Sequence, residues 1–200
     1  MVVKRKPTEI RQQQIVDVAQ KIIFKYGSEH LTIKRIANEI GISEAAIYRH
    51  FENKKAILMF LVSHIEESLL ADIDKAVPLG QTVTLEVVAQ AIQAHFSSIN
   101  SRKGLVFQVI AEIISLGDKN LNKRTLAMID TYIGKLKGLL QEGVRSGSVR
   151  SDVDLDAAAL ILFSLIQTLV ELWALNGCKF SLTDRFNSLW LLYRESIVCR

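Results

Sequence analysis

The sequence predicts an all-α protein, and three observations support this. Only two prolines and ten glycines occur in 200 residues, apolar residues recur at helical spacing, and alternating β-branched residues are rare. Hydrophobic residues make up 49% of the chain, which is enough to bury a substantial core. We expect a small N-terminal domain at residues 8–76 and a larger helical domain at residues 77–200, with the break at Pro78 and Gly80.

The N-terminal domain is expected to hold four helices. A first helix starts near Thr8 and ends at Gly27, because apolar residues between them recur every three to four positions. The segment Leu31–Leu58 then has the pattern of two short helices around a tight turn. It runs directly into a fourth helix, which begins near Asn53 and continues to about Ala76.

The spacing inside Leu31–Leu58 favours a helix-turn-helix, in which the second helix is presented to the DNA major groove. Ala37 is small where the two helices must cross closely, and Gly41 follows where a left-handed backbone is cheapest for glycine. Ser43 can cap the second helix, and Ile47 can close the small core between the two. We therefore expect a three-helix DNA-binding domain followed by a connecting helix.

Five more helices are expected in the larger domain. Glycines separate them, and Asp154 and Thr183 are expected N-caps. Their approximate ranges are 82–101, 104–116, 120–146, 154–176 and 182–198.

Positive charge is concentrated in the first third of the chain. Residues 1–60 contain 11 Lys and Arg against 6 Asp and Glu, whereas residues 61–200 contain 14 against 15. An excess of this size also occurs on ordinary protein surfaces, so charge alone does not decide the partner. Combined with the helix-turn-helix, it indicates that the first third binds double-stranded DNA.

The sequence is typical of a cytoplasmic protein. Cys178 and Cys199 are too few for a disulfide framework, and we expect free thiols. Residues 1–11 lack the apolar core of a signal peptide. The apolar uncharged run Ala157–Val170 is shorter than the roughly 20 residues of a membrane span, so we expect a buried helix and no membrane partner.

Residues around the second helix of the motif have the chemistry of DNA contacts. The guanidinium of Arg49 matches O6 and N7 of guanine, which makes it the best candidate for base readout. Tyr48 has an alternative role, because its ring can pack inside and leave only the hydroxyl exposed. The expected DNA-binding residues are Thr32, Lys34, Ser43, Glu44, Ala45, Ala46, Tyr48, Arg49, His50 and Lys54.

Taken together, the segment LTIKRIANEIGISEAAIYRHFENKKAIL resembles the DNA-binding signature of the TetR family of bacterial transcriptional regulators. The resemblance covers residues 8–70 and implies that Tyr48, His50 and Lys54 contact phosphates, while residues 44–46 and Arg49 read bases. The matching positions are Thr32, Ile36, Ala37, Gly41, Ile42, Ser43, Ile47, Tyr48, His50, Phe51, Asn53, Lys54 and Leu58.

The resemblance also implies a homodimer of nine- or ten-helix subunits. In the family, the second domain holds a pocket for a small-molecule effector, and the last two helices of each subunit form a four-helix interface. Two DNA-reading heads related by two-fold symmetry fit a palindromic operator. The residue at position 49 varies across the family, so the resemblance does not give the operator sequence.

The composition of the last two expected helices agrees with such a dimer. Leu155–Leu175 is apolar nearly all round, whereas a surface helix of a monomer shows a polar face. A symmetric interface through both helices covers the second apolar face. The expected interface residues are Leu160, Phe163, Gln167, Val170, Phe186, Leu189, Trp190 and Tyr193.

Apolar residues with a few polar neighbours indicate an effector pocket in the larger domain. A place in an ordinary core is an equally good interpretation of each one. The expected effector is a hydrophobic or amphipathic small molecule that relieves repression, and activation or corepressor action stays open. The candidate effector-binding residues are His95, Phe96, Phe107, Gln108, Glu112, Phe163, Gln167 and Trp173.

An enzyme is the main alternative from another class. The sequence lacks the HExxH, CxxC, GxSxG and glycine-rich phosphate-loop patterns. Asp152, Asp154 and Asp156 resemble the start of a calcium loop without its Gly and Glu, and helix capping explains them better. We therefore expect no catalytic residue, metal or cofactor. A non-specific DNA-binding or protein-binding protein of the same fold remains the alternative to a specific regulator.

Overall fold

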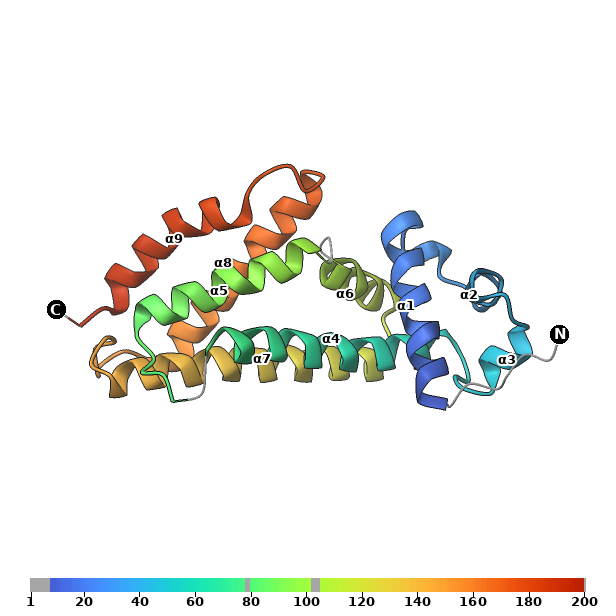
Figure 1. Cartoon of the computed structure of the whole chain (residues 1–200), viewed down its shortest axis with the longest axis horizontal. Coiled ribbons are helices and arrows are strands. Elements are labelled where there is room, and N and C mark those ends of the chain that lie inside the picture. Colours follow the sequence, from blue (N-terminus) through green and yellow to red (C-terminus); the bar gives the residue numbers. More distant parts are fainter. Residues whose placement is uncertain (1–7, 78–79, 102–104, 200) are drawn as a thin grey trace. The chain divides into compact units, whose positions relative to one another are not determined.

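A computed structural model describes residues 8–77, 80–101 and 105–199 of the chain (Figure 1). Within these ranges the fold is all-α, as the sequence predicts, and its only β pairing is one isolated bridge between Val149 and Val198. The elements are α1 (Thr8–Tyr26), the 3-10 turn η1 (Ser28–His30), α2 (Ile33–Ile40), α3 (Glu44–Tyr48), α4 (Lys54–Ala76), α5 (Leu85–Ser101), α6 (Leu105–Leu116), α7 (Lys119–Arg145), α8 (Leu155–Leu175) and α9 (Leu182–Ile197).

The helix bounds agree with the expected ones to within a few residues, and one expected cap is wrong. The Asp154 carboxylate accepts hydrogen bonds from the backbone N–H groups of Asp156 and Ala157, which confirms it as the N-cap of α8. Helix α9 is capped by Ser181, whose hydroxyl accepts from the N–H of Asp184, and not by Thr183. The segment offers two hydroxyl residues two positions apart, and local pattern alone does not choose between them.

The described residues form two compact units. Unit 1 takes the chain up to Ile65 together with Gln108–Thr125, and unit 2 takes Glu66–Phe107 together with the chain from Leu126 onward. Helices α4, α6 and α7 contribute residues to both units, so the contacts do not follow a single cut in the sequence. The boundary near residue 77, placed from sequence breaks, stays a prediction.

Unit 1 is built on the packing of α1 against α2 and of α2 against α3. Ile36, Ala37 and Ile47 are all at most 1% exposed, which confirms the small core expected between the helices of the motif. Gly41 has a φ of 76°, and its N–H bonds back to the Ala37 and Asn38 carbonyls. This left-handed residue ends α2 and turns the chain into α3.

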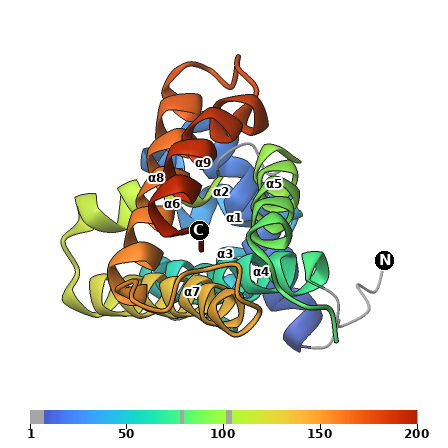
Figure 2. The ribbon, with the colours of Figure 1, turned by 90° about the vertical axis from the view of Figure 1, so that its left-hand side faces the viewer.

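Unit 2 is held together by the packing of α8 against α9 and of α5 against α9. Helices α8 and α9 lie side by side in both views (Figure 1 and Figure 2). Phe96 of α5 and Phe186 of α9 meet edge to face with their ring centroids 5.2 Å apart, and both are fully buried. Aromatic packing therefore fixes one side of α9 within its own subunit.

Among the described residues, one helix is long and apolar enough to cross a membrane by length and composition, namely α8 with a mean hydropathy of 1.9. The core helix of a soluble protein passes the same test. Only 39% of its most apolar window is buried in this subunit, so α8 keeps an apolar face that the subunit does not cover.

Candidate functional site

Two capped turns position the candidate DNA-reading helix. Thr32 caps α2 by accepting from the N–H of Arg35 at 3.2 Å, and Ser43 caps α3 by accepting from the N–H of Ala46 at 3.2 Å. With Gly41 between them, these caps fix where α2 ends and α3 begins. Helix α3 is short, and Arg49 forms its C-cap.

The outward face of α3 carries the residues expected to meet DNA. Glu44, Ala45 and Arg49 are exposed, while Ile47 on the opposite side is fully buried. Tyr48 is 51% exposed, so its ring does not pack into the core, contrary to the alternative left open by the sequence. The turn therefore presents small, charged and aromatic side chains together on one surface of unit 1.

The remaining candidates around α3 differ in their surroundings. Lys34, like Thr32, is exposed at the start of α2. Ala46 and His50 are half-buried, and the Nδ1 atom of His50 is enclosed without a hydrogen-bond partner.

Lys54, the first residue of α4, forms an ion pair inside unit 1. Its Nζ lies 2.6 Å from Oε1 of Glu112 on α6, where the Glu112 side chain is only 8% exposed. The sequence had assigned Lys54 to DNA and Glu112 to the effector, and the structure joins these two residues to each other. The neighbouring Lys55 pairs with Asp118 at 2.6 Å and holds the pKa of that carboxyl below its usual value.

The interior of unit 2 contains a polar cluster drawn from three helices, which we call the interior cluster: Asp72 of α4, His95 of α5 and Tyr132 of α7. The Nδ1 atom of His95 lies 3.6 Å from Oδ2 of Asp72, and the rings of His95 and Tyr132 are 5.6 Å apart between centroids. Phe163 of α8 meets the Tyr132 ring edge to face at 6.0 Å.

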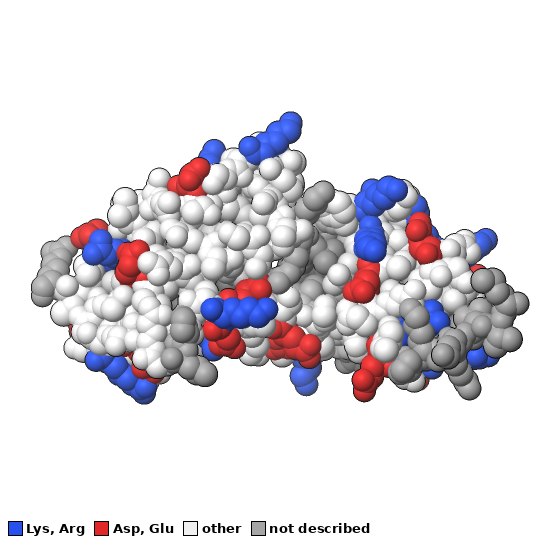
Figure 3. Space-filling view, in the orientation of Figure 1, with Lys and Arg blue, Asp and Glu red and all other residues white. Residues whose placement is uncertain are grey.

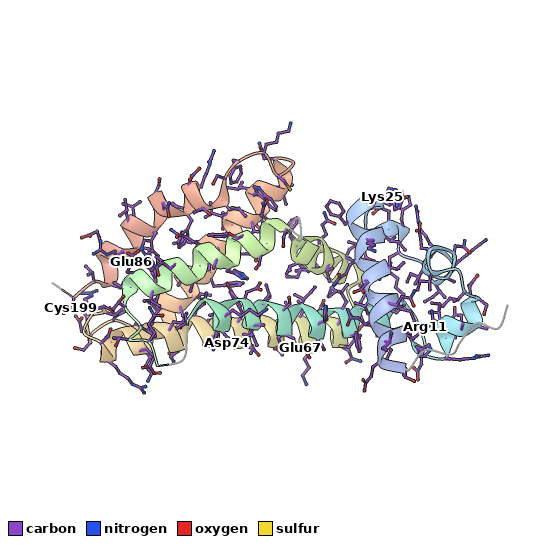
Figure 4. All side chains as sticks on the ribbon, viewed as in Figure 1. Arg11, Lys25, Glu67, Asp74, Glu86 and Cys199 are labelled. Carbon is purple, nitrogen blue, oxygen red and sulfur yellow. The ribbon has the colours of Figure 1, made fainter. Side chains whose placement is uncertain are left out.

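The interior cluster is enclosed and incompletely hydrogen-bonded. His95 is 2% and Tyr132 is 5% exposed, yet His95 Nδ1 and the Tyr132 hydroxyl have no hydrogen-bond partner. Burial, and then the negative charge of Asp72, raise the pKa of Tyr132, so its phenol stays protonated. Glu67 and Asp74 lie on the side of α4 away from α5 (Figure 4) and are exposed.

Sequence reasoning included His95 but missed Asp72 and Tyr132. A signal was present, because Asp72 continues the apolar spacing of Ile65 and Leu69, and Tyr132 that of Met128. A polar residue in register with a buried apolar stripe is a better indicator of an interior site than polarity alone.

The other expected effector residues are spread over different surroundings. Phe96 and Trp173 are 1% exposed, and Phe96 packs on Phe186 as ordinary core. Gln167 donates from its amide to Glu171 at 3.0 Å on the same helix. Phe107 belongs to unit 2 and is half-buried, whereas Gln108 belongs to unit 1 and its Oε1 is enclosed without a partner.

An apolar groove runs between α8 and α9 on the surface of unit 2. It has a volume of about 970 Å³. Leu160, Ile161 and Leu172 are each at least 50% exposed along it. Charged side chains are sparse over the part of unit 2 around α5 and α9 in the face that Figure 3 shows. The groove residues are Leu160, Ile161, Ser164, Leu165, Thr168, Leu169, Leu172, Asp184, Arg185, Ser188 and Leu189.

Half of the residues expected at a dimer interface face inward instead. Val170, Phe186, Trp190 and Tyr193 are at most 6% exposed, and the Tyr193 hydroxyl donates to the carbonyl of Ala158 at 2.9 Å. They join α9 to the rest of its own subunit. Leu160 and Leu189 do line the open groove, while Phe163 and Gln167 are half-buried.

Comparisons with known proteins find matches that together cover most of the chain. A family model described as "Bacterial regulatory proteins, tetR family" matches residues 15–59, and one described as "YsiA-like protein, C-terminal region" matches residues 55–195. The chain is 26% identical over 176 residues to the fatty acid metabolism regulator protein of Bacillus subtilis (strain 168), covering 88% of this chain and 90% of that protein.

Two further similarities extend this result. The crystal structure of the transcriptional regulator FadR from Bacillus subtilis in complex with stearoyl-CoA superposes with a TM-score of 0.78 at 26% identity, covering 90% of this chain and 96% of that one. The nucleoid occlusion factor SlmA of Vibrio atlanticus (strain LGP32) is 23% identical over 187 residues, which is 94% of this chain and 95% of that protein. These relatives are regulators or DNA-associated factors rather than enzymes.

We expect Lys54→Met to destabilise the protein more than Glu112→Gln does. Removing the ammonium deprives a nearly buried carboxylate of its ion pair, which costs about 3 kcal/mol in the free energy of unfolding. Removing the carboxylate charge leaves a lysine that is 29% exposed and can turn to water, at a cost of about 1 kcal/mol. Urea denaturation at pH 7 measures both values.

Lys55→Met is the matched control, because the Lys55 side chain is 58% exposed and its ion pair faces solvent. It should change the stability little. If both lysine variants lower the free energy of unfolding equally, the Lys54–Glu112 pair contributes no more to stability than a surface ion pair does.

Proposed function

Since the chain belongs to the TetR family of bacterial transcriptional regulators, we propose that it is a repressor that binds a palindromic operator as a homodimer. An amphipathic effector of the long-chain acyl-CoA class releases it from DNA. The protein acts in the cytoplasm, on the nucleoid when bound. The observation that carries the proposal is the exposed face of α3, which is held by the Thr32 and Ser43 caps and carries Tyr48 and Arg49 outward.

The DNA contacts divide into reading and positioning residues. Arg49 reads a base edge, and Glu44, Ala45 and Ala46 shape the approach of α3 to the groove. The remaining contacts position the helix on the backbone without reading sequence. These positioning residues are Thr32, Lys34, Ser43, Tyr48 and His50, whereas Lys54, also expected from the sequence to contact phosphate, is engaged by Glu112.

The homodimer is supported by the uncovered apolar face of α8. Its groove places Leu160, Ile161 and Leu172 in water unless a second body covers them. A two-fold axis through this face lets α8 and α9 of one subunit pack on the same helices of the other. The interface then consists of the groove residues, with the buried aromatic residues of α9 supporting it from behind.

The acyl-CoA effector is supported by the comparisons with known proteins and, separately, by the interior of unit 2. One relative of 26% identity is named for fatty acid metabolism, and a structure of the same identity holds stearoyl-CoA. In this chain, the interior of unit 2 combines apolar packing around Phe163 with the unpartnered groups of His95 and Tyr132. A long apolar chain with a polar end fits that combination.

Release follows from linkage between the two sites. Suppose that the effector binds more tightly to the form whose reading heads are wrongly spaced for the operator. The factor by which the effector then weakens operator binding equals the factor by which the operator weakens effector binding. Helix α4 carries Lys54 next to the reading segment and Asp72 in the interior cluster. It is therefore the element that would couple effector binding to DNA binding.

A role in nucleoid occlusion is the second candidate, and the similarity to SlmA favours it. In that case the protein binds DNA without repressing an operator under effector control. Effector response then separates the two candidates, because both involve binding to DNA.

The first experiment selects bound sequences from a random DNA pool and then titrates stearoyl-CoA into the complex. We expect a palindromic motif that is preferred over random DNA by at least roughly 10³-fold, and release of that DNA at micromolar stearoyl-CoA. Stearate and free coenzyme A are the controls for the two halves of the ligand. A palindrome that stearoyl-CoA fails to release would favour the second candidate. The absence of any motif would point to non-specific binding.

Arg49→Ala should lose about 1–3 kcal/mol of binding at one base position in each half-site and relax the preference there. Lys34→Ala serves as the matched control on the exposed surface of α2. It should weaken binding to all sequences alike and reduce the salt dependence by about one phosphate contact. Binding to a set of single-base operator variants distinguishes these patterns. Uniform weakening by Arg49→Ala would make Arg49 a backbone contact.

Leu172→Glu should convert the dimer to monomers and abolish high-affinity operator binding. Leu172 is 50% exposed in the groove, and a carboxylate there has to be desolvated when the proposed interface forms. Leu126→Glu is the control, since Leu126 is 58% exposed on α7 and lies outside the groove. Analytical ultracentrifugation reads the oligomeric state. A dimeric Leu172→Glu variant would place the interface elsewhere.

A further inference from the structure

We propose that the interior cluster of Asp72, His95 and Tyr132 binds a neutral carbonyl oxygen of the effector, which for an acyl-CoA is the oxygen of the thioester. This inference rests on the proposed effector class and adds which atom of the ligand is recognised and by which residue. Tyr132 is the group that donates the hydrogen bond.

The first argument is the missing partner of the Tyr132 hydroxyl. A buried polar group without a hydrogen bond carries a desolvation cost, and native proteins rarely keep one without a reason. Tyr193 shows how the same subunit treats a structural tyrosine, because its hydroxyl donates to the carbonyl of Ala158 at 2.9 Å. Tyr132 has no such acceptor, although it is equally buried. The acceptor is therefore expected to come with the ligand.

The second argument is the charge of the cluster. The protonated phenol of Tyr132 has a hydrogen to donate, so it suits an acceptor. Oδ2 of Asp72 lies 3.6 Å from Nδ1 of His95, and the Asp72 side chain is 9% exposed, so its carboxylate disfavours a second buried anion beside it. A free fatty acid would bring such an anion. A thioester brings a neutral acceptor.

The third argument is the position of the cluster among four helices. Asp72, His95 and Tyr132 come from α4, α5 and α7, and Phe163 of α8 closes on the Tyr132 ring at 6.0 Å. The aromatic ring of Phe163 beside the Tyr132 hydroxyl suits an apolar chain that carries one polar atom. Polar groups set within an apolar lining are the usual means by which small-molecule sites fix ligand orientation.

The test compares two ligands that differ in one oxygen, stearoyl-CoA and the thioether S-octadecyl-CoA. Isothermal titration calorimetry with the full chain measures both dissociation constants. The wild-type protein should bind the thioester about tenfold more tightly than the thioether. Tyr132→Phe should reduce this preference to near one, mainly by weakening the thioester complex.

Tyr193→Phe is the matched control, since it removes a hydroxyl that is already bonded within the subunit. It should keep the tenfold preference. The thermal midpoint of the unliganded proteins gives a second readout. Tyr193→Phe should lower it, whereas Tyr132→Phe should leave it unchanged or raise it, because no hydrogen bond of the folded chain is lost.

Each contrary outcome has a separate meaning. Equal binding of both ligands to the wild type overturns the carbonyl assignment and leaves the acyl-CoA effector standing. Binding of neither ligand removes the acyl-CoA effector and this assignment together. If Tyr132→Phe lowers the thermal midpoint as much as Tyr193→Phe does, the Tyr132 hydroxyl has a structural partner, such as a buried water, and the proposal is overturned.

Discussion

Helix α8 has more apolar surface than its own subunit covers, and this surplus organises unit 2. Helix α8 packs on α9, and its Trp173 and Ile166 are nearly fully buried within the subunit. Its Leu160, Ile161 and Leu172 stay exposed along the groove between α8 and α9. Because exposed apolar area of this extent favours association, a helix that serves as core for one subunit also provides the means of joining two. In the proposed homodimer, the spacing of the two DNA-reading heads depends on how α8 and α9 of one subunit pack on the same helices of the other.

Much of the fold was predictable because local signals were strong. Gly41 was expected to adopt a left-handed backbone at the end of a helix, and it does so at the C-cap of α2. Ser43 and Asp154 were expected to cap helices, and they are the N-caps of α3 and α8. Which face of α8 is buried was not predictable, because the local signal there is weak. A helix that is apolar nearly all round has little periodicity, so spacing could not show that Val170 points inward and Leu172 outward. The interface proposed from sequence therefore mixed both sides.

Contacts between distant residues explain most of the remaining differences. Lys54 and Glu112 are 58 positions apart, and nothing local to either predicts that they pair. Their pairing changes the physical account of both. Lys54 cannot be treated as a freely solvated cation that waits for phosphate, since a nearly buried carboxylate on α6 already attracts its ammonium. The ion pair thus links α6 to the first residue of α4, the helix that follows α3.

The interior cluster illustrates how the proposed function limits the stability of this chain. Replacing Asp72, His95 and Tyr132 by apolar residues of similar volume would remove desolvation costs and fill the same space. A site that recognises one polar atom of a mostly apolar ligand has to keep such groups, and to leave at least one of them unpaired until the ligand arrives. Because this donor gains a hydrogen bond only when the ligand binds, the ligand-bound form has fewer buried polar groups without a partner. In the proposed mechanism, that difference in hydrogen bonding is a source of the free energy by which the effector shifts the protein away from its DNA-binding form.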